Sequence, residues 1–522
     1  MQDKNHPKGI RIEIGSKTIN VASYILFGRI LTFAMIGIAL ILVTRILGPT
    51  QYGIYTLAVA FAGIFGSIGY FGVGTALNKF IAEYKEKKDK YEISTIFSNA
   101  LFLVIITGVV LTAISFLLSN FISGYIFHTS SMSYVIKAVS FWIITAMLFG
   151  TVYDSLLGFG NGRNVAIAAS IQAFFQAGIS IVLALMGFGA LAPIFGLVFG
   201  YFIGFIIGIT LMFRYNKLHL TLPSAFHIKK LVGFSLPVAT ASIFGGLIGS
   251  FGLVLLGYFT VPAVLGNIGI ASRTSSLLSI VFDSISFAIL PTFSAVASNL
   301  KLKKQIGRLY GYTVYLAILF VSPLLFYIAI FSLPFSYTLF GGSYSSAPLY
   351  MSVLSIGLLI GIAGSYANTV LISSGHVKLS LKYNSMAYII VFILFVILIP
   401  LFGGLGYALV SFLIAPLLLD IIIIKGLLKL IKVDFRIRKL LGIIIANILV
   451  SLLLYPLYFI SNGIMLLVLA AAGFCILYPL ISVIMGGADK GDTNTIKELS
   501  KGIPVAGRAM FILAEYADLV IR

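Results

Sequence analysis

Residues 19–47 read INVASYILFGRILTFAMIGIALILVTRIL, a stretch in which only Arg29 and Arg45 are charged. About 20 consecutive apolar residues are enough for a helix to cross the hydrocarbon core of a membrane, so this stretch predicts a transmembrane helix. It is too long for the apolar region of a cleaved secretion signal, and the residues before it are polar. The rest of the chain continues the pattern, because 60% of its 522 residues are hydrophobic and only 10% are charged. This composition excludes a soluble globular protein.

Fourteen apolar stretches, bounded by Gly, Pro and charged residues, predict an all-α polytopic membrane protein with 14 transmembrane helices. These stretches are 19–47, 51–77, 93–119, 134–157, 164–186, 192–213, 231–258, 263–298, 309–331, 347–372, 383–400, 405–427, 440–459 and 464–486. Because the number is even, both termini are expected on the same side. All but four of the 35 Lys and Arg residues fall in segments on that side. The positive-inside rule therefore predicts a multi-pass protein of the cytoplasmic membrane with both termini in the cytoplasm.

The net charge of +20 is explained by this topology, so no nucleic-acid partner is predicted. Basic clusters beside a membrane typically contact anionic lipid headgroups, and residues 496–522 predict an amphipathic helix on the inner leaflet. The connections are too short for a catalytic domain, and the sequence contains no Walker A, HExxH or GxSxG motif. The five histidines are scattered and Cys475 is the single cysteine, so no metal site or other cofactor is predicted. These observations favour a transporter and not an enzyme.

The chain also matches itself at an offset of 213 residues. Residues 49–53 fall on 262–266 and, with a slip of one residue, Asp154 falls on Asn368 and Gly189 on Gly403. The offset spans six predicted helices, an even number, so the two copies share one orientation and predict a parallel repeat of two pseudo-symmetric six-helix lobes. The predicted domains are a cytoplasmic N-terminus (1–18), an N-lobe (19–213), a basic cytoplasmic linker (214–230), a C-lobe (231–427), two C-terminal helices (428–486) and a cytoplasmic amphipathic tail (487–522).

The second helix of each copy is overlong, running from residue 51 to about residue 83 and from residue 263 to residue 298. At 1.5 Å per residue a helix of about 36 residues reaches about 54 Å, against a hydrocarbon core of about 30 Å. Each of these helices is therefore expected to bend or to project into the cytoplasm.

Residues 44–55, TRILGPTQYGIY, resemble the aRxLGpxxyGxy signature that closes helix 1 in the polysaccharide-transport family. These are the O-antigen-type flippases of the multidrug/oligosaccharidyl-lipid/polysaccharide (MOP) superfamily. Further matches are LGYF at 256–259, LFGGSY at 339–344 and GGLGYA at 403–408, and the resemblance covers essentially the whole chain. It implies two lobes around a central cavity and translocation of a polyprenyl-(pyro)phosphate-linked oligosaccharide from the inner to the outer leaflet by alternating access. At Gly252, where such proteins often carry an acidic residue in helix 7, this sequence departs from the pattern, which argues against a cation site there.

Two arginines are expected near the middle of the membrane. Arg29 and Arg273 each lie ten residues, or about 15 Å, from the start of their helices. A charge at this depth costs at least about 2.5 to 3.5 kcal/mol, so we expect a cationic cavity for substrate phosphate, with a structural ion pair as the alternative. Arg45 is a further candidate for substrate contact, although a position near the outer headgroups is ordinarily explained by snorkelling.

Other polar residues lie within the predicted helices. Asp420 in helix 12 is the candidate for ion coupling, with a structural pair as the alternative. Asp154 and Asp283 fall near the cytoplasmic boundary and are expected to pair with loop lysines. Gln172 and Gln176 are one helical turn apart, so they share a face that either binds sugar hydroxyls or hydrogen-bonds a neighbouring helix.

Helix 7 contains Pro237, Gly246 and Gly249, a combination that predicts a bend and a hinge. The alternative is close helix packing through small residues.

The favoured function is a flippase for lipid-linked oligosaccharide, because guanidinium groups bind phosphate bidentately. One alternative is a cation-coupled multidrug exporter of the same superfamily, which needs carboxylates in its cavity, and another is a non-transporting scaffold for envelope assembly. Predicted helices 1, 2 and 7 carry no Asp or Glu in the membrane core, which favours the flippase. The expected partners are the lipid-linked oligosaccharide, anionic membrane lipids and membrane proteins of glycan assembly.

Overall fold

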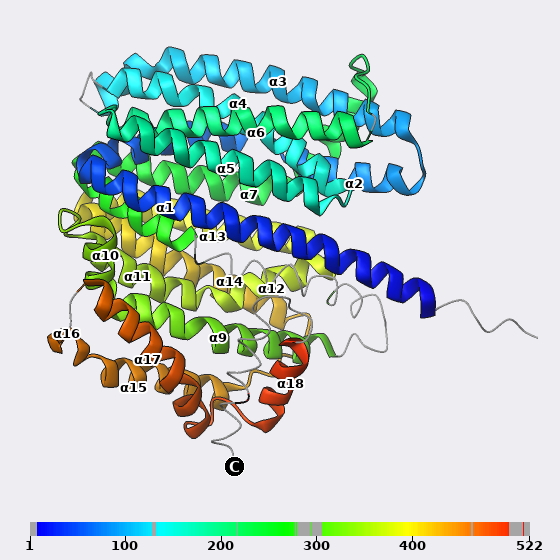
Figure 1. Ribbon diagram of the computed structural model, residues 1–522. Helices are drawn as coiled ribbons and strands as arrows, with labels where there is room; N and C mark the ends of the chain where they lie inside the picture. Colours follow the sequence, from blue (N-terminus) through cyan, green and yellow to red (C-terminus); the bar gives the residue numbers. More distant parts are fainter. Residues whose placement is uncertain are drawn as a thin grey trace, which may run out of the picture. The chain divides into compact units, whose positions relative to one another are not determined.

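The computed structural model describes residues 8–127, 132–216, 218–276, 305–460 and 463–500, together with Leu278, Phe293 and Glu515. The chain divides into two compact units, Met1–Leu265 and Gly266–Arg522, and each is considered by itself. Every regular element of the described chain is helical (Figure 1). In unit 1 these are α1 (Lys8–Gly69), α2 (Val73–Glu86), α3 (Lys90–Phe121), η1 (Ile122–Ile126), α4 (Met132–Gly158), α5 (Gly162–Leu185), α6 (Leu191–Asn216) and α7 (Ala225–Phe259).

A helical segment at residues 262–276 spans the boundary between the two units in the chain. Its residues 262–265 belong to unit 1 and its residues 266–276 to unit 2. Unit 2 continues with α9 (Ile306–Ile330), α10 (Ser332–Phe340), α11 (Ala347–Ile360), α12 (Ile362–Ser373), α13 (Val377–Ala408), η3 (Leu409–Ile414), α14 (Ala415–Leu428), α15 (Ile437–Leu454), α16 (Leu457–Ile460), α17 (Gly463–Ile484) and α18 (Lys490–Ser500).

Nine helices of the described chain are long and apolar enough to cross a membrane, or ten when the bent pair α11 and α12 is counted as one span. The protein is therefore an all-α polytopic membrane protein, as its composition predicts. Two of the nine, Phe27–Gly69 and Val377–Leu428, contain 43 and 52 residues. One crossing needs only about 20 residues, so each is long enough for two crossings.

Both long spans change direction at a glycine. Gly48 in α1 has φ 70°, and Gly403 in α13 has φ 55°, so each lies in the left-handed region that a glycine adopts without penalty. Pro49 follows Gly48 directly and suits the first position of a new helix, because its missing N–H would have no partner there. Each kink therefore separates two helices that join without a loop.

The overlong second helix of the first copy does bend, as predicted. α1 ends at Gly69 and α2 begins at Val73, and the residues between them form a turn closed by a 2.8 Å hydrogen bond from the Val73 N–H to the Tyr70 carbonyl. The corresponding helix of the second copy, 263–298, lies mostly outside the described residues.

A glycine ladder brings α6 against α5 in unit 1. Gly196, Gly200, Gly204 and Gly208 recur every four residues, so they occupy one face of α6. A Cβ at Gly200 would lie 2.7 Å from the Cβ of Gln176 on α5, and the same close approach recurs at Gly204. Small residues of this spacing allow membrane helices to pack backbone to backbone. Figure 1 shows α5 and α6 side by side over most of their length.

α9 is the central helix of unit 2. Its buried Tyr315 and Leu319 pack with residues of α15 and α17, and its buried Tyr310 and Val314 pack with residues of α12 and α14. The buried amide of Asn447 on α15 donates a 2.8 Å hydrogen bond to the Ser322 hydroxyl on α9, while the Tyr478 hydroxyl on α17 donates one to the Leu319 carbonyl. Because a polar group in an apolar interior is costly without a partner, these bonds fix the register of the three helices.

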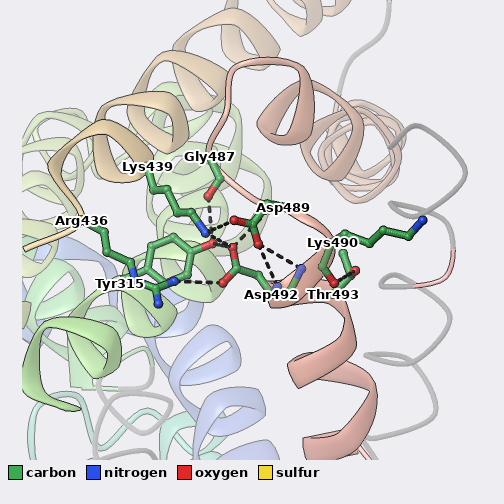
Figure 2. A network of polar contacts seen from close by, with 9 residues as sticks. Tyr315, Arg436, Lys439, Gly487, Asp489, Lys490, Asp492 and Thr493 are labelled. Carbon is green, nitrogen blue, oxygen red and sulfur yellow. Dashed lines mark hydrogen bonds and ion pairs between the residues drawn. The ribbon is translucent and has the colours of Figure 1, made fainter. Parts of the chain in front are cut away.

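A polar cluster holds the short helix α18 on unit 2 (Figure 2). The Asp492 side chain is only 3% exposed and forms ion pairs with Arg436 at 3.2 Å and with Lys439 at 2.5 Å. It also accepts a 2.8 Å hydrogen bond from the Tyr315 hydroxyl on α9. The carboxylate of Asp489 shares Lys439. The start of the predicted tail is therefore bound to the helices by buried charge, whereas its predicted amphipathic part lies mostly outside the described residues.

The compact units do not coincide with the predicted lobes. α7 packs against α1, α2 and α3 and so belongs to unit 1, whereas the repeat assigns residues 231–258 to the C-lobe. The domain boundaries taken from the repeat stay a prediction.

Candidate functional site

Arg29 lies in the first half of α1 and is half-buried. Gly28, just before it, lets α1 approach α5 closely, because a Cβ at Gly28 would lie 2.6 Å from the Cβ of Ala166. The Arg29 guanidinium interacts with the hydroxyl of Tyr153 on α4. Tyr153 also interacts electrostatically with Asp154, so the arginine belongs to a polar group within unit 1.

The other two candidate arginines are exposed. Arg273 lies in the helical segment 262–276 of unit 2, and Arg45 lies close before the kink of α1. The polar run around Arg273 is satisfied in part by its own helix, since the hydroxyls of Thr274 and Ser276 donate to the carbonyls of Ile270 and Ser272 at 3.0 Å. Because Arg29 and Arg273 belong to different units, each is described in its own surroundings.

The prediction that Asp154 pairs with loop lysines is wrong. Its carboxylate accepts a 2.9 Å hydrogen bond from the hydroxyl of Tyr70, which stands in the turn between α1 and α2. A Cβ at Gly74 on α2 would collide with this carboxylate, so Asp154 sits directly against the backbone of α2. The distance of 84 residues between Asp154 and Tyr70 explains why local sequence context did not predict the pair. Asp283 lies outside the described residues.

The two glutamines of α5 hydrogen-bond each other, so the predicted hydrogen bond to a neighbouring helix is wrong, whereas the predicted contact with sugar hydroxyls stays a prediction. The Gln172 amide donates a 2.6 Å hydrogen bond to the Gln176 side-chain oxygen, so the pair satisfies itself along one helix. The glycine ladder of α6 covers both side-chain stems. These residues are therefore part of the α5 to α6 packing.

Asp420 on α14 is buried beside a break in the helices of unit 2. α11 and α12 are bent by 42° where they meet at Gly361. The Asp420 carboxylate accepts a 2.8 Å hydrogen bond from the backbone N–H of Gly364, in the first turn of α12. A Cβ at Gly364 would collide with this carboxylate. A π-helical segment, η3, directly precedes α14, and such segments are frequent at functional sites.

A cavity of about 330 Å³ opens beside Asp420. Its polar lining includes Ser365, Asn368 and Asn384. Asn368 accepts hydrogen bonds from the Ser380 hydroxyl at 2.6 Å and from the Asn384 amide at 3.1 Å. One carboxylate with neighbouring amide and hydroxyl oxygens is a donor set that suits a proton or a small hard cation.

The sequence analysis missed Asn384, and it noted Asn368 only as the partner of Asp154 in the repeat. That repeat was the signal that pointed to the Asn368 position. The described residues contain no group of three or more His, Cys, Asp or Glu side chains that would bind a transition metal.

The candidate hinge residues lie in α7, which is one continuous helix. A Cβ at Gly246 would lie 2.6 Å from the Ser67 hydroxyl oxygen on α1, whereas no atom lies within 4 Å of such a Cβ at Gly249. Pro237 lies in the same helix. The contact at Gly246 is the close packing expected of the alternative, while Gly249 has the space a hinge needs.

Comparisons with known proteins place this geometry in context. The model of the polysaccharide biosynthesis protein family matches residues 20–297. Among solved structures, the lipid II flippase MurJ in its inward closed conformation superposes with a TM-score of 0.71, at 16% identity, over 89% of this chain and 98% of that one. An inward-facing multidrug resistance MATE family transporter of the MOP superfamily gives a TM-score of 0.61, at 16% identity, over 76% of this chain and 93% of that one.

A further match is a MOP superfamily transporter from Pyrococcus furiosus Vc1, with a TM-score of 0.56 at 15% identity, over 79% of this chain and 94% of that one. A comparison with curated protein sequences finds no match.

The fold is therefore the one seen in the MOP superfamily transporters. Because the family model covers more than half of the sequence, the chain belongs to the polysaccharide biosynthesis protein family.

Proposed function

We propose that the protein is a flippase that moves a polyprenyl-(pyro)phosphate-linked oligosaccharide from the inner to the outer leaflet by alternating access. The observation that carries the proposal is membership of a polysaccharide biosynthesis family together with a fold shared with the lipid II flippase. A transporter in such a pathway handles glycan, and glycan built on a membrane carries a lipid phosphate. The proposed partners are this lipid-linked oligosaccharide, anionic membrane lipids and membrane proteins of glycan assembly.

The proposed topology has 14 helices in two pseudo-symmetric lobes plus two C-terminal helices, with both termini in the cytoplasm. The ten spans found in the described residues support it, because two of them are long enough for two crossings each. α7 and the helix predicted at 263–298 complete the number. The left-handed glycines Gly189 and Gly403, which the repeat aligns, have the same φ of 55°. This agreement supports the parallel repeat.

Arg29 and Arg273 are the proposed contacts for substrate phosphate, with Arg45 as a further candidate. Guanidinium forms paired hydrogen bonds to phosphate oxygens, and the anion offsets the cost of a cation in the membrane. Moving an anion outward across an inside-negative potential is favourable by about 2.3 kcal/mol per charge per 100 mV, so the potential assists this direction.

The test is export of lipid-linked glycan by cells in which the chromosomal copy is replaced. We expect Arg29→Ala and Arg273→Ala each to abolish export at normal protein abundance, and Lys at either position to restore it only in part. Tyr153→Phe is the matched control, because it removes the described partner of Arg29 and leaves the cation in place. Full export by the Arg29→Ala, Arg273→Ala double variant at wild-type abundance would refute the phosphate role.

Asp420 is the proposed site of ion coupling. Its carboxylate is buried against the Gly364 N–H and lines the cavity with Asn368 and Asn384, so it is held where a bound proton or cation alters local charge. Asp420→Asn keeps an oxygen for the Gly364 N–H and removes the charge. We expect this variant to fold and to lose the dependence of export on the ion gradient, whereas unchanged gradient dependence contradicts coupling at Asp420.

A further inference from the structure

Unit 1 contains a second cavity, of about 370 Å³, between α1, α4 and α7. Its lining residues are Gly63, Gly66, Ser67, Tyr70, Trp142, Ile143, Ala146, Met147, Gly246 and Ser250. None of these side chains carries a charge, and the volume lies within the range of about 300 to 1,000 Å³ that small-molecule sites occupy. The composition is that of a site for a neutral ligand with both apolar and hydrogen-bonding surface, and not of a site for phosphate.

The turn between α1 and α2 positions Tyr70 at this cavity. Phe71 has φ 44° and Gly72 has φ 69°, and a left-handed bulky residue such as Phe71 is a strained position that the surroundings must stabilise. The Tyr70 hydroxyl is held by Asp154, and the ring lies against Gly150 of α4, where a Cβ would be 3.2 Å away. The aromatic ring is therefore held in one orientation on the cavity wall.

Glycines let α1 and α7 pack closely beside this cavity. Gly63 on α1 faces Ser250 on α7, and Gly246 on α7 faces Ser67 on α1, with a Cβ at either glycine coming within 3 Å of the opposite hydroxyl oxygen. The arrangement brings two hydroxyl groups to the cavity from opposite helices. Ser67 donates to the Gly63 carbonyl at 2.8 Å, which leaves its oxygen able to accept a hydrogen bond.

Trp142 on α4 is the single tryptophan of the sequence. Its indole nitrogen is buried and has no hydrogen-bond partner in the described part of the chain. A buried donor without a partner is destabilising, and a ligand group that accepts from it would remove this cost. The indole also packs edge-on against Tyr201 of α6, with ring centroids 6.3 Å apart, which limits its movement.

We propose that this cavity binds one neutral sugar ring of the substrate glycan. This inference rests on the function proposed above. The Trp142 and Tyr70 rings contact the C–H faces of the sugar, and the Trp142 N–H and the hydroxyls of Ser67 and Ser250 hydrogen-bond its hydroxyl groups. The site takes the glycan and not the phosphate, because its wall carries no cation. It is therefore a specificity site, separate in chemistry from the arginines.

The test uses the fluorescence of Trp142 in the purified full-length chain. The probes are methyl glycosides of glucose, galactose and N-acetylglucosamine, and sorbitol at equal concentration controls for bulk polyol effects. Because no other tryptophan contributes, a saturable change in emission reports on this cavity. We expect at least one glycoside to produce it, and Ser67→Ala to raise the half-saturating concentration about tenfold, as expected for one lost hydrogen bond.

Gly66→Leu fills the cavity, and Gly178→Leu is its matched control. No atom lies within 4 Å of a Cβ at either glycine, and both are in helices of unit 1, but Gly178 on α5 lies outside this cavity. We expect the emission change to disappear in Gly66→Leu and to persist in Gly178→Leu. Absence of a saturable change with every glycoside, or an unaltered response in Gly66→Leu, overturns the proposal.

Failure of this proposal and failure of the flippase proposal are distinguishable. Glycoside binding in Gly178→Leu with full export by the Arg29→Ala, Arg273→Ala double variant would leave the sugar site and reject the phosphate role. Abolished export in the arginine variants together with normal export in Gly66→Leu would support the phosphate role and reject the sugar site.

Discussion

Replacing Asp492 tests whether buried charge holds α18 to unit 2. Asp492→Asn removes the carboxylate charge from the ion pairs with Arg436 and Lys439, but it keeps an oxygen that can accept from the Tyr315 hydroxyl. Removing one member of a buried ion pair costs about 3 to 5 kcal/mol. Here Lys439 keeps Asp489, and the Arg436 side chain is 39% exposed and lies over the Tyr312 ring, so neither cation is left buried alone. We therefore expect the free energy that holds α18 on unit 2 to fall by about 2 to 3 kcal/mol in Asp492→Asn.

Two measurements check this value. The first is the thermal stability of the purified protein, with Glu83→Gln as the matched control. The side chains of the Glu83 to Lys87 pair are 42% and 60% exposed, and such pairs contribute at most about 1 kcal/mol. The second is labelling of Thr493→Cys by a thiol reagent in a Cys475→Ala background. Thr493 is 1% exposed, so the introduced thiol is expected to be protected until Asp492→Asn releases the helix.

A docked α18 predicts a clear difference between the two variants. If Asp492→Asn lowers the melting temperature no more than Glu83→Gln and leaves the thiol of Thr493→Cys protected, the ion pairs do not hold the helix. Apolar packing of α18 would then be the remaining explanation.

Further predictions concern pH, the hinge and topology. Burial raises the pKa of Asp489, but hydrogen bonds from Lys439 and Asp492 outweigh it and lower the pKa to about 2, so its contribution is complete above about pH 4 and is lost as the pH falls toward 2. The thermal stability of the purified protein should therefore fall over that interval, and less so in Asp489→Asn. Gly246→Leu should overpack against Ser67 and lower stability by about 1 to 3 kcal/mol, whereas Gly249→Leu should fold normally and, if α7 acts as a hinge, block transport; normal transport in Gly249→Leu excludes a hinge there. Cysteines at Lys87 and Arg308 should resist an impermeant thiol reagent on intact cells, while a cysteine at the exposed Ser343 should react, and labelling at position 87 contradicts the proposed orientation.

Much of the fold could be predicted from the length and the boundaries of the apolar stretches. The apolar stretches predict the described helices, and the excess length of residues 51–83 predicts a bend. The position of that bend did not follow from the sequence, because a left-handed Phe71 is opposed by local preference. The turn is held instead by tertiary contacts of its neighbours, Tyr70 with α4 and Gly72 with α7. The four-residue glycine spacing of α6, in contrast, was present in the sequence and indicates helix packing directly.

The polar interior was harder to predict than the helices. Depth in a helix identified Arg29 and Asp420 as residues that need an explanation, but it did not identify their partners, Tyr153 and the Gly364 N–H. These contacts join helices far apart in the chain, and helical spacing determines only which residues share a face. The assignment of Asp154 to loop lysines failed for the same reason, since the charge of a nearby loop carries no information about a tyrosine hydroxyl 84 residues away.

The predicted repeat aligns polar positions of the two units whose side chains differ in chemistry. The predicted repeat aligns Asp154 with Asn368, and each of them takes part in a polar group of its own unit. In unit 1 the acidic member is bound by the Tyr70 hydroxyl, and the neighbouring cavity is lined by uncharged groups suited to sugar. In unit 2 the equivalent residue is an amide, and the buried carboxylate is supplied instead by Asp420 on α14. The predicted repeat and the two proposed sites together imply similar helix arrangements with different polar groups, because the buried carboxylate is Asp154 in one unit and Asp420, on a helix that does not correspond to it, in the other.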